Sequence, residues 1–143
     1  MKFNTKTRYA VRTVLEIALS DSTDGIFQKD IAQKQEISVR YLDHIIAALK
    51  AAGLITTIRG KKSGYILTRK PGQITLYDIH RAFEPGINIV DCLAVNKSCE
   101  KEMTCASKFY WDELNHLIEQ YLKSTTIADL VAKHDELYAK HSG

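Results

Sequence analysis

The sequence predicts a mainly α-helical fold that contains one small β-hairpin and ends in long helices. Three observations support this prediction. Apolar residues recur at helical spacing up to residue 53, two β-prone runs flank a basic turn, and an apolar stripe follows residues 106–123. With 143 residues, the chain is long enough for one compact domain, or for a small domain that carries a helical extension.

The first half of the chain predicts three helices. Apolar side chains at helical spacing cover residues 7–19, and the polar run 20–25 ends this first helix. A short second helix covers residues 28–34. After a tight turn, Ser38 is a good N-cap for a third helix. That helix ends at Gly53, because glycine tolerates the left-handed backbone at a helix C-terminus.

The third helix has an apolar face and a polar face. Its apolar stripe, which we expect to be buried, consists of Leu42, Ile45, Ile46, Leu49 and Ala52. The opposite face exposes Arg40, Tyr41, Asp43, His44 and Lys50 to solvent.

Two β-prone runs follow, over residues 54–58 and 65–68. The residues between them are basic and bounded by glycines, which predicts a hairpin with a positively charged tip. Three helices followed by such a hairpin are typical of the winged helix-turn-helix. A Pro-Gly pair closes this domain, which we place at residues 1–72.

Residues 73–106 are predicted to form a linking helix and a loop that carries cysteines. Thr75 begins the helix with a capping-box pattern, and the run Glu84-Pro85-Gly86 ends it. No periodicity is sustained from residue 87 to residue 105, so we expect a loop there.

Residues 107–143 predict a dimerisation helix, which begins near residue 106, and a last helix, which begins after Thr126. The dimerisation helix carries a continuous apolar face made of Trp111, Leu114, Ile118, Tyr121 and Leu122. This face is more apolar than a short extension could cover alone, so we expect a two-fold homodimer to bury it.

Charge is divided unevenly between the two halves. Residues 1–72 hold 13 Lys and Arg against 6 Asp and Glu, a net charge of +7. Residues 73–143 hold 7 against 11, a net charge of −4. A basic domain beside an acidic one is typical of a protein that binds a polyanion with one end.

The composition excludes several classes of protein. Hydrophobic residues make up 45% and charged residues 26%, which argues against disorder. No apolar run is long enough for a membrane span, and the first residues lack the pattern of a secretory signal. We therefore expect a cytoplasmic protein without a membrane partner. In that compartment thiols stay reduced, so its three cysteines are not expected to form structural disulfides.

Double-stranded DNA is the polyanion that a winged helix would bind. The first turns of the third helix would place Ser38, Arg40, Tyr41 and His44 against base edges in the major groove. The hairpin would bring Arg59, Lys61 and Lys62 to phosphates or to the adjacent minor groove. The alternatives are a solvated helix face and a charged turn that only blunts a sheet edge.

Cys92, Cys99 and Cys105 are separated by six and five residues. Thiolates are the ligands of iron-sulfur clusters, so three of them together predict a cofactor-binding and metal site for a [2Fe-2S] or [4Fe-4S] cluster whose fourth ligand is open. The spacing lacks the two-residue gaps of common structural zinc sites. Two alternatives remain: three unrelated cysteines, or a cluster-free switch in which a thiol is oxidised.

Catalysis finds little support in the sequence. The five histidines are scattered, and neither a phosphate-binding glycine loop nor a nucleophile with a base and an orienting partner is evident. We therefore expect no enzyme. A protein-interaction adaptor that uses the winged helix only as a scaffold is the alternative from a different class, but it would not need a domain with a charge of +7.

The chain resembles the winged-helix transcription regulators that include the iron-sulfur cluster regulator and the nitric-oxide-sensing repressor. The resemblance covers nearly the whole chain. It rests on Thr7-Arg8-Tyr9-Ala10-Val11, on Ile37-Ser38 leading into Tyr41-Leu42, on Gly53-Leu54-Ile55, on Arg59-Gly60 with Gly64-Tyr65, on the three cysteines and on Trp111.

The resemblance implies a homodimer on an imperfect inverted repeat, held by the long helix. It also implies control of genes for iron-sulfur assembly, cysteine metabolism or nitrosative stress. The three cysteines fall where cluster-bearing members place their ligands. At the two positions where such members supply the fourth ligand, this chain has Arg8 and Lys108, and a protonated arginine or lysine has no lone pair for a metal.

Overall fold

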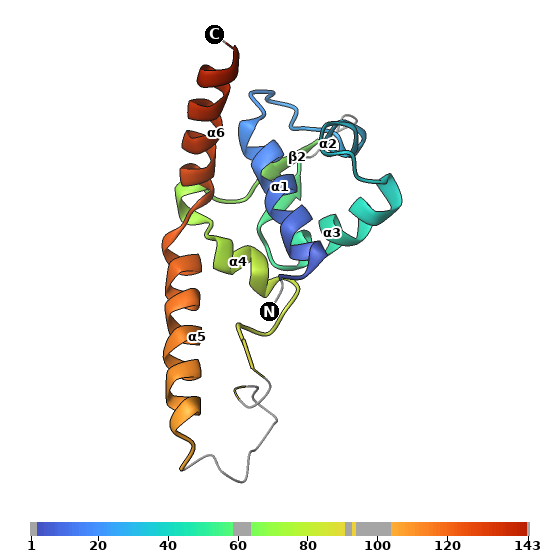
Figure 1. Cartoon of the computed structure of the whole chain (residues 1–143). Coiled ribbons are helices and arrows are strands. Elements are labelled where there is room, and N and C mark those ends of the chain that lie inside the picture. The colour runs from blue at the N-terminus through green and yellow to red at the C-terminus, as the bar shows by residue number, and fades with distance from the viewer. Residues whose placement is uncertain (1–2, 59–63, 91–92, 94–103, 143) are drawn as a thin grey trace.

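The computed structural model describes residues 3–58, 64–90, 93 and 104–142. Within these ranges the chain forms six α-helices, one short 3-10 helix and one two-stranded antiparallel sheet (Figure 1). This arrangement confirms the predicted mainly α-helical fold with a small hairpin. Within the same ranges, none of the helices combines the length and the apolar character needed to cross a bilayer.

Local capping sets the ends of the first three helices, which are α1 (Thr5–Leu19), α2 (Gln28–Gln35) and α3 (Val39–Ala51). Asn4 caps α1 by accepting a hydrogen bond from the Lys6 amide at 2.8 Å. Ser38 caps α3 by accepting one from the Tyr41 amide at 3.1 Å. Gly53 has a φ of 74° just after α3, as predicted for the end of that helix.

The predicted buried stripe of α3 is confirmed at four of its positions. Leu42, Ile45, Ile46 and Leu49 are buried in the core. Ala52 was expected in the same stripe, and this was wrong: it is the C-cap residue, which lies at the end of the helix beyond the buried core, and it is exposed. Tyr41, expected on the polar face, is half-buried.

The hairpin is shorter than the two β-prone runs predicted. Strand β1 (Ile55–Thr57) pairs with β2 (Tyr65–Leu67) in antiparallel register, with Ile55 opposite Leu67. The loop between α1 and α2 adds an isolated bridge, in which the amides and carbonyls of Ile26 and Tyr65 exchange hydrogen bonds of 3.1 and 2.8 Å. The hairpin is therefore tied to the helical part by backbone as well as by side chains.

This bridge requires glycine on both sides. A Cβ on Gly64 would lie 2.4 Å from the Asp24 carbonyl oxygen and 2.5 Å from the Gly25 carbonyl carbon. Gly25 itself has a φ of 77°, and a Cβ there would lie 2.7 Å from the Gly64 carbonyl carbon. Since all these neighbours are backbone atoms, no side-chain rotation can relieve the overlap.

The buried core runs across the expected boundary at residue 72. The short 3-10 helix η1 (Pro71–Gln73) leads to Ile74, which is fully buried and accepts a hydrogen bond from the Ile127 amide at 2.9 Å. Ile79 and Ile127 are also fully buried in the same cluster as the core of α1 and α3. The start of the C-terminal part therefore shares one core with the winged helix.

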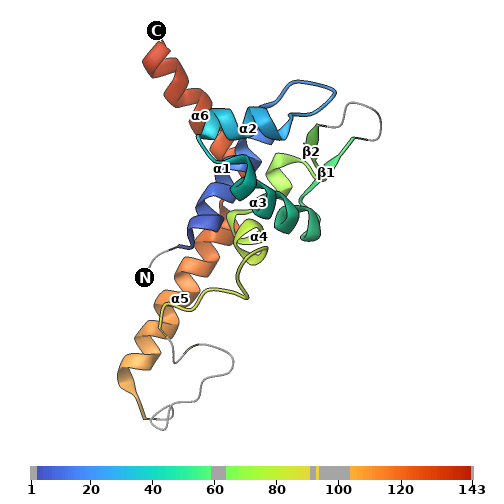
Figure 2. The same ribbon diagram turned by 90° about the vertical axis from the view of Figure 1, so that its right-hand side faces the viewer.

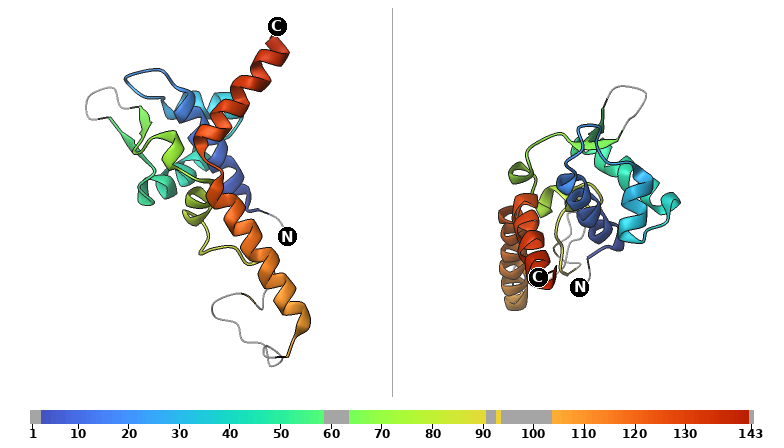
Figure 3. Two further views of the ribbon diagram at one scale, coloured as in Figure 1. Left: turned by 90° about the vertical axis from the view of Figure 1, so that its left-hand side faces the viewer. Right: turned by 90° about the horizontal axis from the view of Figure 1, so that it is seen from above.

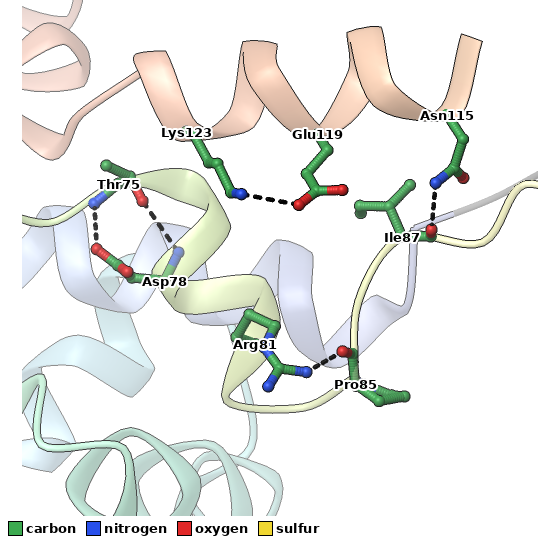
Figure 4. A network of polar contacts seen from close by, with 8 residues as sticks. All are labelled: Thr75, Asp78, Arg81, Pro85, Ile87, Asn115, Glu119 and Lys123. Carbon is green, nitrogen blue, oxygen red and sulfur yellow. Dashed lines mark hydrogen bonds and ion pairs between the residues drawn. The ribbon is translucent and has the colours of Figure 1, made fainter. Parts of the chain in front are cut away.

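Helix α4 (Leu76–Arg81) begins with the predicted capping box, which Figure 4 shows. The Thr75 hydroxyl accepts from the Asp78 amide at 3.0 Å, and the Asp78 carboxylate accepts from the Thr75 amide at 2.9 Å. The helix ends at Arg81, earlier than the run 84–86 that was expected to end it. The next amides still bond to the last helical carbonyls, and Arg81 donates to the Pro85 carbonyl, so a turn intervenes before the proline.

The last two helices, α5 (Ala106–Ser124) and α6 (Ile127–Ser142), follow one another along one side of the molecule. Figure 1 shows that α5 extends well beyond the N-terminal helices, and Figure 2 shows the same from another side. Seen from above in Figure 3, both lie on the opposite side of α1 from α2 and α3. The exposed side of α3 is thus turned away from α5 and α6.

A strap, defined as residues 86–89, joins α4 to the cysteine-bearing loop and is held at two points. The His80 Nε2–H donates to the Gly86 carbonyl at 2.8 Å. The Asn115 amide of α5 donates to the Ile87 carbonyl at 2.6 Å and accepts from the Ile89 amide at 3.0 Å (Figure 4). The start of the loop is thereby fixed to both α4 and α5.

An ion pair and a cation–π contact also join α4 to α5. Lys123 lies 2.8 Å from the Glu119 carboxylate and 4.7 Å from the ring centroid of Tyr77 (Figure 4 shows the ion pair). The hydrogen bond from Lys123 lowers the pKa of Glu119, and the same bond raises the pKa of Lys123. The pairing therefore weakens when acid protonates Glu119 or when base deprotonates Lys123.

We predict that Gly64→Ala lowers the free energy of unfolding by about 1–3 kcal/mol, because the added methyl group overlaps backbone atoms. Urea unfolding followed by circular dichroism measures this decrease. Gly72→Ala is the matched control, since its Cβ would meet only the Ala128 Cβ at 3.9 Å. Equal stability of the two variants would contradict the assigned close approach.

We predict that Asn115→Ala lowers the free energy of unfolding by about 1–3 kcal/mol, since two backbone groups of the strap lose their partner. It should also speed proteolytic cleavage between residues 86 and 105. Gln120→Ala, at an exposed position of the same helix, is the control. A cleavage rate identical to that of the control would show that Asn115 does not hold the strap.

Candidate nucleic-acid interface and cysteine site

The first two turns of α3 bring three of the predicted DNA-contact residues together. Ser38, Arg40 and His44 are all exposed there. In Figure 2, α3 lies below both α2 and the hairpin, and its C-terminal end leads into β1. Hydroxyl, guanidinium and imidazole groups supply donors and acceptors that match base edges and phosphates.

The fourth predicted residue of α3, Tyr41, also has a supporting role. Its ring packs edge-on against Tyr9 of α1, with 5.7 Å between centroids. The Arg12 guanidinium lies 4.9 Å from the Tyr9 ring centroid and donates to the Gln35 carbonyl at 2.7 Å. These contacts join α1 to the end of α2 and to α3. They therefore fix how α2 and α3 are placed relative to each other.

A second set of contacts fixes the start of α3, and sequence reasoning missed it. The Gln28 side-chain amide of α2 donates to the Val39 carbonyl at 3.2 Å and to the Asp43 carboxylate at 2.5 Å. Val39 is 52% exposed although it is aliphatic. Val39 directly follows the N-cap residue Ser38. This position in the sequence could have revealed that its side chain is exposed.

The basic hairpin residues Arg59, Lys61 and Lys62 lie outside the described residues. The base of the hairpin is described: the Ile58 amide donates to the Gly64 carbonyl at 3.3 Å, and the Gly64 amide donates to the Asp24 carbonyl at 3.0 Å. The hairpin therefore leaves the body next to the loop between α1 and α2.

Of the three cysteines, Cys92 and Cys99 also lie outside the described residues. Cys105 is the N-cap residue of α5, is half-buried, and has its Sγ 3.2 Å from the Ser107 Oγ. A cysteine sulfur is a ligand for iron-sulfur clusters. Cys105 thus fits a thiolate ligand. Among the residues that are described, no three His, Cys, Asp or Glu side chains converge on a common metal position.

The two positions that the resemblance assigns to a fourth ligand carry cations. Arg8 lies exposed on α1, where its guanidinium donates to the Thr5 hydroxyl at 3.4 Å. Lys108 lies in the first turn of α5, close in sequence to Cys105. Neither cation offers a lone pair to iron.

The apolar surface of α5 is rotated from the face that the sequence suggested. Trp111, Leu114 and Tyr121 are exposed, whereas Ile118 is half-buried and Leu122 is only 9% exposed within the protomer. Three further apolar residues of α5 are exposed: Phe109 at 67%, Tyr110 at 66% and Leu117 at 60%. Of these, Tyr110 and Leu117 lie at helical spacing with Leu114 and Tyr121. The exposed apolar face of α5 is therefore defined by Tyr110, Trp111, Leu114, Leu117 and Tyr121.

Comparison with known proteins gives a consistent result. The sequence profile of the Rrf2 family, described as iron-dependent transcriptional regulator, matches residues 3–133. Protein rrf2 of Nitratidesulfovibrio vulgaris is 37% identical over 131 residues, which cover 92% of this chain and 87% of that protein.

Solved structures agree with the fold. The structure of CymR (YrzC), the global cysteine regulator of B. subtilis, superposes with a TM-score of 0.77 at 32% identity and covers 93% of this chain and 98% of that chain. T. potens IscR superposes with a TM-score of 0.75 at 32% identity, covering 96% and 90% respectively. The profile match, these relatives and the winged helix confirm the predicted resemblance: the chain belongs to the Rrf2 family of transcriptional regulators, not to a family of enzymes.

Proposed function

We propose that this chain is a DNA-binding transcription regulator that acts as a homodimer and senses redox, iron-sulfur or nitrosative status through a labile iron-sulfur cluster on its three cysteines. The observation that carries the DNA-binding part is the exposed first turn of α3, capped by Ser38 and held to α2 by Gln28. Since DNA is the ligand, the proposed place of action is the cytoplasm.

In this proposal the contacts to DNA divide into two kinds. Arg40 and His44 face base edges in the major groove, and Ser38 and Tyr41 reach bases or phosphates beside them. Arg59, Lys61 and Lys62 contact the phosphate backbone or the adjacent minor groove. The net charge of +7 on residues 1–72 supports this assignment, because it attracts DNA independently of sequence.

The dimer would form through α5. Its exposed apolar face has residues spaced at three and four positions, from Tyr110 through Leu114 and Leu117 to Tyr121, which is the spacing of one continuous helical stripe. Two copies of this stripe can cover each other around a two-fold axis. A two-fold dimer places its recognition helices symmetrically, which suits an imperfect inverted repeat in the operator.

The cluster would be held by Cys92, Cys99 and Cys105, as [2Fe-2S] or [4Fe-4S]. When bound, such a cluster supplies an iron centre that oxidants can destroy. The fourth ligand is open: Asp91, Glu100, Glu102 or Asp112, a group of the partner subunit, or an exogenous thiol or water could fill it. Any of these oxygen or exogenous donors would bind iron less firmly than a cysteine thiolate, which favours lability.

The strap connects the proposed cysteine-bearing sensor loop to the DNA-binding domain. Asn115 holds the strap to α5, and His80 holds it to α4, whose Ile79 lies in the core shared with α1 and α3. Loss of the cluster would change the position of the loop that continues from the strap. We propose that this change is transmitted through α4 and alters operator affinity.

A cluster-free thiol switch is the second candidate. It is favoured by the similarity to CymR, described as a global cysteine regulator, and by the position of Cys105 at a helix N-terminus. There oxidation of the thiol would act as the switch. The two candidates share DNA binding and differ only in whether the cysteines hold iron.

We predict that replacing Lys61 and Lys62 with alanine weakens binding to all DNA sequences alike and lowers the slope of log affinity against log salt by roughly one for each phosphate that is no longer neutralised. Fluorescence anisotropy over a salt series measures this slope. Lys133→Ala with Lys140→Ala removes the same charge from α6 and should leave the slope unchanged. Arg40→Ala should instead alter sequence preference. An unchanged slope in the hairpin variant would refute the proposed binding of phosphates by the two lysines.

We predict that Leu117→Glu converts the dimer to a monomer, because a carboxylate would be buried without a partner at the interface. Sedimentation analysis at micromolar concentration reports the mass. Gln120→Glu adds the same charge at an exposed position outside the apolar face and should remain dimeric. A folded monomer in the unaltered protein would count against the dimer.

We predict that anaerobic reconstitution gives a coloured protein with bound iron and sulfide, which loses its colour in air and remains a folded dimer. Each of Cys92→Ala, Cys99→Ala and Cys105→Ala should bind much less iron, whereas Thr104→Ala, next to Cys105, should bind as the unaltered protein does. Visible absorption with iron and sulfide analysis measures this. Equal, negligible iron in all five proteins would reject the cluster and leave the thiol switch.

A further inference from the structure

Val39 is the one large apolar residue of α3 that is exposed among the described residues. The large aliphatic side chains Leu42, Ile45, Ile46 and Leu49 of that helix are buried in the core. A single exposed aliphatic residue is ordinary on a protein surface, so exposure alone indicates no role. The position of Val39, at the first residue of the helix proposed to read DNA, distinguishes it from the others.

The backbone at Val39 is held from two sides. Ser38, directly before it, caps the helix through the Tyr41 amide at 3.1 Å. Gln28 of α2 reaches across and donates to the Val39 carbonyl at 3.2 Å, with a second bond to Asp43 one turn later at 2.5 Å. A β-branched side chain in a helix also has one strongly preferred rotamer. Val39 therefore presents its methyl groups in a fixed direction and loses little conformational entropy when a ligand packs against it.

The chemistry of an aliphatic side chain limits what it can recognise. Three of the four bases present only hydrogen-bonding groups in the major groove, whereas thymine also presents a C5 methyl group. Covering a polar base edge with valine would remove water without supplying a hydrogen bond, which is unfavourable. Covering a methyl group removes apolar surface from water on both sides, which is favourable.

We propose that Val39 is a specificity-determining residue that contacts the C5 methyl group of one thymine in each half of the operator. This inference rests on the proposed function, in which α3 lies in the major groove. The contact of Val39 is apolar, whereas those of Arg40 and His44 are polar. Val39 would therefore recognise one base by its methyl group instead of by its hydrogen-bonding groups.

The test uses deoxyuridine, which keeps every hydrogen-bonding group of thymidine and lacks only the methyl group. The full-length protein first selects its operator from a random duplex library. Each thymine of that operator is then replaced singly by uracil, and affinities are measured by fluorescence anisotropy at one salt concentration. The unaltered protein should bind about three- to five-fold more weakly when one particular thymine of each half-site is replaced, the effect of one buried methyl group.

Val39→Ala should bind the thymine operator about three- to five-fold more weakly and should no longer distinguish thymine from uracil at that position. Leu137→Ala is the matched control, because Leu137 on α6 is 48% exposed against 52% for Val39. The control should bind, and should distinguish the two bases, as the unaltered protein does.

Two results would overturn the inference and leave DNA binding intact. One is an operator at which no uracil substitution weakens binding. The other is a Val39→Ala variant that keeps the full difference between thymine and uracil at every position. If instead the unaltered protein selected no sequence and bound no duplex at low salt, the proposed function itself would be wrong. The inference about Val39 would then be wrong too.

Discussion

The structure depends on the burial of one face of α1. Ala10, Val14 and Ile17 are buried on this face, and α1 contacts α2, α3, α4, α6 and the strand β2. Thr13 is fully buried as well, and its hydroxyl donates to the Tyr9 carbonyl one turn earlier at 2.8 Å. Because this hydroxyl is hydrogen-bonded, its burial costs little free energy of folding. Because α2 and α3 lie on one side of α1 and the C-terminal helices lie on the other, α1 determines how the two groups are placed relative to each other (Figure 3).

Features set by neighbouring residues could be predicted from the sequence, and features set by distant contacts could not. The capping by Ser38, the capping box of Thr75 and the glycine after α3 depend on residues a few positions apart, and all three were confirmed. The strap contact between Asn115 and Ile87 joins residues 28 positions apart, so no local pattern reveals it. The same limit applies to Gln28, whose partners on α3 become neighbours only after the helix-turn-helix folds.

The face of α5 shows this limit most clearly. Its apolar residues extend around more of the helix than one interface needs, and sequence alone assigned Leu122 and Ile118 to the dimer. Packing against the rest of the protomer buries Leu122, and the apolar residues left outside are centred on Leu117. One side of α5 therefore packs within its own protomer. The N-cap residue of this helix is Cys105. In the proposed regulator, one rigid helix would connect the partner subunit, the strap and the sensor.

The paired glycines at positions 25 and 64 have a consequence for how such a protein diversifies. The base of the hairpin is closed by backbone hydrogen bonds of Ile26, Ile58 and Gly64. Positions 25 and 64 therefore tolerate almost no substitution, because a side chain at either one meets backbone atoms. Related chains would keep this joint between the hairpin and the helices only where both positions stay glycine.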